Sequence, residues 1–157
     1  MKQITIVLVT LIFIAASGQE AFAQKKVAKK SQEMNYWTVL SMVMMQKKFD
    51  EDIGIDIDVP KFGKKVKELN GQEITIRGYI LPLKASKNQK YFILSAVPFN
   101  QCFFCGGAGP ESVMEVFSTK PVKASKKMVK LRGKLRVNFN PSIGQVLYTL
   151  KDAKVVD

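Results

Sequence analysis

The chain has 157 residues, with 25 lysines and arginines against 13 aspartates and glutamates, so its formal charge is +12. This charge is compatible with binding to nucleic acid, to an anionic membrane surface or to an acidic partner. Only three basic residues are arginines, and few aromatic residues lie among the lysines. We therefore expect no nucleic-acid binding. The sequence has no histidine and only two cysteines, which leaves out the commonest general base and a framework of several disulfides.

The first residues have the pattern of a secretory signal peptide. Lys2 precedes an apolar run, Ile4–Ala16, and Ala21-Phe22-Ala23 offers a small-x-small cleavage site. The run is shorter than the roughly 20 residues that span a bilayer, and an uncleaved anchor is the alternative. We therefore predict a signal peptide over residues 1–23, export to the periplasm or the medium, and no transmembrane segment in the mature chain.

The next segment is polar and rich in lysine, and we predict that residues 24–35 form a flexible basic tether. Residues 36–157 are expected to form a single β-rich domain. At the start of this domain, residues 36–49 fit helical and strand spacing equally well. Their three methionines are interpreted as flexible core filler beside Trp37; they are Met42, Met44 and Met45.

An acidic stretch follows, and Gly54 and Pro60 interrupt it. Glycine and proline mark turns and loops, and the spacing of the carboxylates does not match an EF-hand calcium loop. We therefore interpret residues 50–60 as a solvated acidic loop. Beyond it, Phe62, Val66 and Leu69 share the spacing of one helical face, which predicts a short helix.

From Glu73 onward the pattern changes to that of β-strands separated by polar turns. Five strands are expected, over residues 73–83, 91–96, 113–117, 128–139 and 145–156. Gly78 and Gly133 interrupt two of them and indicate bends or bulges. Because a curved antiparallel sheet of this size tends to close, we predict a small OB-like five-stranded antiparallel barrel with a short helix. A β-sandwich is the alternative.

The two cysteines lie in the stretch QCFFCGGAGPES, which spans residues 101–112. Cys102 and Cys105 at this spacing suit a structural disulfide, half of a metal site or a redox couple. The glycines and proline that follow permit or fix unusual backbone angles, and we interpret them as shaping the loop; they are Gly106, Gly107, Gly109 and Pro110.

For a metal site, the candidate ligands are Cys102, Cys105 and Glu111, and the candidate metals are zinc and copper. A zinc site within one chain lacks further cysteines and any histidine, although two chains could combine their pairs. For redox catalysis, the expected βαβ context is missing. The bulky Phe103 and Phe104 favour burial of the pair, and burial raises the pKa of a thiol.

Several motifs together resemble a family of small exported bacterial proteins that is known as a domain of unknown function, DUF3299. The most specific is Cys102–Val113, and the segment Leu69–Leu83 carries a second match. Further matches are Trp37, Leu40, Pro60, Phe62, Gly133, Leu135, Tyr148 and Leu150. The resemblance implies an exported barrel-like domain without a known reaction. Relatives encoded near transporter components linked to metal supply point toward metals. As a partner, we expect an envelope protein or a transporter component.

From these observations we predict an exported binding or accessory protein rather than an enzyme. In the first hypothesis, Cys102 and Cys105 bind a metal or sense redox state. In the second, the protein is a structural adaptor for a protein partner, and the cysteines form a structural disulfide. A thiol–disulfide oxidoreductase is the third.

Overall fold

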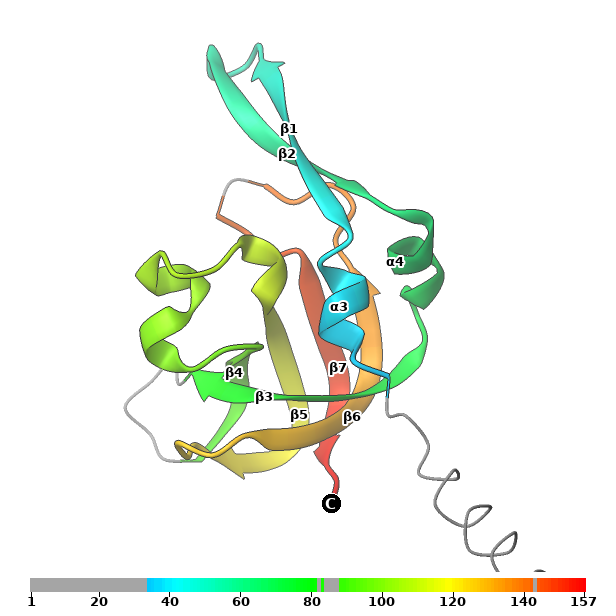
Figure 1. Ribbon diagram of the computed structural model, residues 1–157, viewed down its shortest axis with the longest axis vertical. Helices are drawn as coiled ribbons and strands as arrows, with labels where there is room; N and C mark the ends of the chain where they lie inside the picture. The colour runs from blue at the N-terminus through cyan, green and yellow to red at the C-terminus, as the bar shows by residue number, and fades with distance from the viewer. Residues whose placement is uncertain (1–33, 82, 84–87, 143) are drawn as a thin grey trace, which may run out of the picture. The chain divides into compact units, whose positions relative to one another are not determined.

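The structure is a computed structural model, and it describes residues 34–81, 83, 88–142 and 144–157. The predicted signal peptide and residues 24–33 of the predicted tether lie outside the described residues. Asn35–Asp157 forms one compact unit, shown as a coloured ribbon in Figure 1. No helix in the described part of the chain is long and apolar enough to cross a membrane.

Five strands close into a barrel in the order β3-β4-β5-β7-β6. Their bounds are Glu73–Leu81 for β3, Asn88–Ser95 for β4, Val113–Lys123 for β5, Val129–Val137 for β6 and Tyr148–Val155 for β7. The predicted five-stranded OB-like barrel is therefore confirmed, and it has the Greek-key character of that fold. The prediction that every pair is antiparallel is wrong, because β5 and β7 are parallel. An odd number of strands cannot alternate in direction all the way around a closed ring.

The two glycines predicted to bend strands lie where strands approach each other closely. β3 pairs with β6 as far as Gly78 and with β4 from Tyr79 onward, so Gly78 marks the change of partner. A Cβ atom on Gly78 would lie 2.6 Å from the carbonyl oxygen of Ser95, and one on Gly133 would lie 2.7 Å from that of Lys151. The pairing of β6 with β7 also shifts register at Gly133. Both bends let the sheet curve into a ring.

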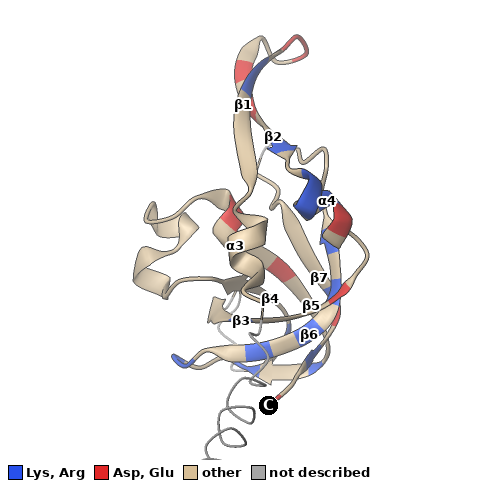
Figure 2. Cartoon of the chain, turned by 45° about the vertical axis from the view of Figure 1, so that its right-hand side comes forward, with Lys and Arg blue, Asp and Glu red and all other residues tan. Residues whose placement is uncertain are grey.

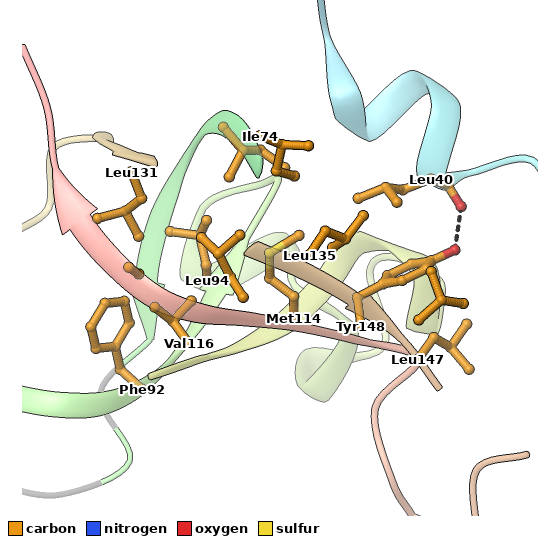
Figure 3. Close-up of a cluster of buried hydrophobic side chains, with 14 of the residues drawn as sticks. Leu40, Ile74, Phe92, Leu94, Met114, Val116, Leu131, Leu135, Leu147 and Tyr148 are labelled. Carbon is orange, nitrogen blue, oxygen red and sulfur yellow. Dashed lines mark hydrogen bonds between the residues drawn. The ribbon is translucent and has the colours of Figure 1, made fainter. Parts of the chain in front are cut away.

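The core lies inside this ring and is filled by alternate residues of each strand (Figure 3). Its largest fully buried side chains include Tyr148, Phe92, Leu40, Ile74, Leu94 and Met114. Tyr148 is the polar member, and its hydroxyl donates a 2.6 Å hydrogen bond to the carbonyl of Leu40. This bond ties the short helix α3, Tyr36–Leu40, to one end of the barrel.

The segment before the barrel contains a hairpin that the sequence interpretation missed. β1, Val43–Asp50, pairs with β2, Ile55–Phe62, in an unbroken antiparallel register. At the tip, the carboxylate of Asp50 accepts hydrogen bonds from the amides of Asp52 and Ile53, and Gly54 has a φ of 71°. Residues 50–60 therefore contain the end of β1, the turn and most of β2, and the prediction of an acidic loop is wrong.

This hairpin is a two-stranded ribbon that extends beyond the barrel (Figure 1). The methionines predicted to fill the core are exposed instead: Met42, Met44 and Met45. Within the described residues no further layer covers the ribbon, and apolar side chains such as Phe49 and Ile55 are in contact with solvent. After β2, the predicted short helix is present as α4, Lys64–Leu69, and its Val66 is fully buried.

Candidate functional site

The cysteines lie in the connection between β4 and β5, which folds as three single turns of 3-10 helix. These turns are η1, Phe99–Gln101, η2, Phe103–Cys105, and η3, Pro110–Ser112. Cys102 precedes η2, and its carbonyl accepts hydrogen bonds from the amides of Cys105 and Gly107. We call the stretch of residues 99–112 the cysteine loop. Its short turns bring both sulfurs to the same side of the backbone.

The two cysteines have different environments. Cys102 is fully buried in a small cluster with Leu81, Ile93 and Val113, which is separate from the core inside the barrel. Cys105 is exposed. One cysteine therefore anchors the cysteine loop to the barrel, while its neighbour stays accessible to reagents in solution.

The sulfur atoms of Cys102 and Cys105 lie 3.6 Å apart, and both are free thiols. The Cys105 thiol also donates a 3.0 Å hydrogen bond to the carbonyl of Phe99. Its hydrogen bond with Cys102 raises the pKa of the Cys105 thiol above its ordinary value, and desolvation adds to the shift. A raised pKa keeps this thiol protonated at neutral pH, which lowers its reactivity as a nucleophile.

Two glycines of the cysteine loop, Gly106 and Gly107, lie where a larger residue would meet an obstacle. Gly106 has a φ of 77°, a left-handed conformation that favours glycine. A Cβ atom on Gly107 would lie 2.7 Å from the carbonyl oxygen of Gln101. Gly109 has an ordinary φ and lies against the carboxylate of Glu111, while Pro110 opens η3. The loop therefore depends on Gly106 and Gly107 for its backbone path.

Glu111, the third candidate ligand, does not join the cysteines. Its carboxylate folds back over Gly109. Burial raises the pKa of the Tyr148 phenol, and the negative charge of Glu111 adds to this rise. Within the described residues, no group of three or more His, Cys, Asp and Glu side chains could hold a metal ion. The structure therefore brings together two of the three predicted ligands.

Phe103 and Phe104 are exposed, by 37% and 60%, so the prediction that they favour burial of the pair is wrong. Cys102 alone of residues 102–105 is buried, and it packs with Ile93 and Val113 in a cluster separate from the core inside the barrel. The two rings pack edge to face, with centroids 5.3 Å apart. They line a cleft that the sequence did not reveal, whose opposite wall is formed by β2. In the sequence, the alternation of Ile and Asp over residues 55–58 is the pattern that could have predicted this strand.

The chain matches the family described as "Protein of unknown function (DUF3299)" over residues 20–157. A crystal structure of a DUF3299 family protein from Pseudomonas aeruginosa is similar at 20% identity with a TM-score of 0.47, and the similarity covers 62% of this chain and 68% of that chain. No curated protein matches the sequence.

Proposed function

Because the chain belongs to the DUF3299 family of proteins of unknown function, we propose that it is an exported binding or accessory protein whose cysteine pair senses redox state. The observation that carries this proposal is the placement of the two sulfurs, 3.6 Å apart with one buried and one exposed. A disulfide bond is about 2 Å long, so a small rotation of the exposed side chain would close it.

The switch is a thiol–disulfide exchange with a small-molecule or protein disulfide. The Cys105 thiolate attacks that disulfide, forms a mixed disulfide and releases one thiolate. The Cys102 thiolate then attacks the sulfur of Cys105 and releases the second thiolate. The pair loses two electrons and two protons, and the external disulfide gains them as two thiols.

The environment of Cys105 favours sensing over catalysis. Catalytic thiols of oxidoreductases have a lowered pKa, held by a helix N-terminus or a nearby cation. The pKa of Cys105 is raised, and residues 91–119 contain no lysine or arginine. Thiol–disulfide exchange at this site is therefore slow. A slow pair suits a sensor whose oxidation state follows the redox potential of its compartment.

Oxidation of the pair should be reversible in glutathione buffers. Free thiols are alkylated and counted by mass after equilibration across a series of potentials. We expect two labelled thiols at the reducing end and none at the oxidising end, with a midpoint between about −300 and −180 mV, the range of labile disulfides. Cys105→Ser should retain one labelled thiol throughout. A midpoint below about −300 mV would contradict sensing and favour the adaptor with a structural disulfide.

A second candidate function is the binding of copper(I). It is favoured because the thiols of Cys102 and Cys105 lie close together without a third ligand among the described residues. Structural zinc sites take four ligands, so the described residues do not fit zinc within one chain. Thiolates are ligands that copper(I) prefers. Copper(I) added to the reduced protein without oxygen should give one copper per chain in native mass spectra. Equal binding by Cys105→Ser would contradict this candidate.

A further inference from the structure

A cleft of about 680 Å³ lies between the β1–β2 hairpin and the cysteine loop. Its walls are mostly apolar. Ile55 and Ile57 of β2 lie on one side, and Phe103, Phe104 and Pro110 of the cysteine loop lie on another. Part of the connection between β6 and β7 also lines the cleft, as do Met45 of β1, Ile93 of β4 and Val113 of β5. The described residues therefore leave an open apolar surface beside the cysteine pair.

The backbone edge of β2 faces this cleft. Successive side chains of a strand point to opposite faces, yet the consecutive residues Ile55, Asp56, Ile57 and Asp58 all line the cleft. Because residues of both faces line it, the cleft runs past the free edge of β2, and it reaches Met45 of β1 as well. Among the described residues, β1 is the strand neighbour of β2. The other edge of β2 thus offers backbone N–H and C=O groups to an added strand.

The charge of the cleft is opposite to that of the protein. Asp56, Asp58 and Glu115 line it, and no lysine or arginine among the described residues does so. Basic positions recur on α4, on β6 and on the hairpin, where they include Lys47 and Lys48 of β1, while the cysteine loop has none (Figure 2). In a chain of formal charge +12, residues 91–119 and 137–150 contain no basic residue. The cleft is therefore an acidic and apolar region on a basic protein.

The carboxylates of the cleft are available to a ligand. Asp56 forms no ion pair with another described residue. The Asp58 ion pair with Lys47 is 3.5 Å long and exposed on both sides, so an incoming cation can replace it at little cost. Glu115 accepts a 2.7 Å hydrogen bond from the Tyr91 hydroxyl. A cation in the cleft would face three carboxylates.

We propose that this cleft binds an extended polypeptide segment in which apolar residues alternate with lysine or arginine. The segment adds a strand to the open edge of β2, where main-chain hydrogen bonds provide affinity. Its apolar side chains pack on Phe103, Phe104 and Val146, and its basic side chains face Asp56, Asp58 and Glu115. Charge complementarity selects this partner over an acidic one.

The test uses a fluorescein-labelled peptide of four lysines alternating with three valines. Its binding to the reduced protein is measured by fluorescence anisotropy at low salt. Asp56→Lys should weaken binding roughly tenfold, the effect expected for a charge close to the ligand. Glu68→Lys, on α4 and outside the cleft, makes the same charge change and should leave affinity nearly unchanged. Phe104→Ser should also weaken binding, because it removes an apolar wall.

Two further peptides separate strand addition from general attraction. A peptide with proline at the central valine should bind several-fold more weakly, because proline lacks the N–H that pairs with the strand edge. A peptide of alternating glutamate and valine should not bind. Equal affinity for all three peptides would overturn the proposal, as would equal losses from Asp56→Lys and Glu68→Lys.

The outcome is independent of the cysteine chemistry. Cys105→Ser abolishes the redox switch but leaves the cleft intact, so the lysine–valine peptide should bind this variant as tightly as the unmodified protein. Sedimentation without peptide tests the remaining occupant, a second copy of the chain. A dimer that Asp56→Lys dissociates would assign the cleft to self-association and overturn the proposal.

Discussion

Gly133→Val is expected to lower the free energy of unfolding by about 3 kcal/mol or more, as overpacking against backbone does. A Cβ atom at Gly133 would lie 2.7 Å from the carbonyl oxygen of Lys151 and 3.1 Å from the Cα of Ala153. Both atoms belong to the backbone of β7, which cannot move without opening the β6–β7 pairing. Urea unfolding monitored by the fluorescence of Trp37, the single tryptophan, measures the loss.

Lys134→Val is the matched control, because it places the same side chain at the next position of β6, where side chains point outward. Its free energy of unfolding should change by no more than about 0.5 kcal/mol. If the two variants were equally stable, the close approach of β6 and β7 at Gly133 would not constrain the barrel.

Tyr148→Phe is expected to cost about 1–3 kcal/mol at neutral pH, the penalty for leaving a buried hydrogen-bonding group without its partner. The variant removes the hydroxyl that donates to the Leu40 carbonyl at 2.6 Å and leaves the ring in place. Because this bond ties α3 to the barrel, loss of structure should begin at α3. Urea unfolding at pH 7 measures the cost, and Tyr91→Phe, at an exposed tyrosine, should change stability by less than about 0.5 kcal/mol.

The difference between wild type and Tyr148→Phe should depend on pH. Burial raises the pKa of Tyr148, and Glu111 adds to this rise, so the native state keeps the phenolic proton where the unfolded state loses it. The stabilising contribution is complete below the unfolded pKa of about 10 and falls by up to about 1.4 kcal/mol per pH unit above it. Tyr148→Phe has no phenolic proton to lose at this position. The difference in unfolding free energy between wild type and Tyr148→Phe should therefore narrow between about pH 10 and 12. A constant difference would contradict the burial of this phenol.

The barrel could be predicted because its strands carry their own signals. Leu131, Leu135 and Val137 alternate with charged residues, and Gly78 and Gly133 mark the bends. The one parallel pair follows from closure of five strands and could have been derived from the prediction itself. The hairpin was missed because the alternation of residues 55–59 was taken for an acidic loop, and no core lies behind it to reinforce the pattern.

The candidate site was predictable only in part. A spacing of two residues places Cys102 and Cys105 within reach of each other in most local conformations, so their proximity needed no tertiary information. Their unequal burial could not be predicted without tertiary information, because it depends on how the cysteine loop packs on Leu81 and Ile93. The cleft combines residues of β2, the cysteine loop and the connection before β7, and no local pattern links segments so far apart.

The position of β7 between β5 and β6 affects when the barrel can form. β7 is the last of the five strands in chain order. Until it has been synthesised, the edges of β5 and β6 that pair with it remain unpaired. Its parallel partner β5 and the closing pair of β3 with β6 add contacts between distant parts of the chain, which slow folding. A chain whose barrel stays open until its last strand is available depends on protection from aggregation until then.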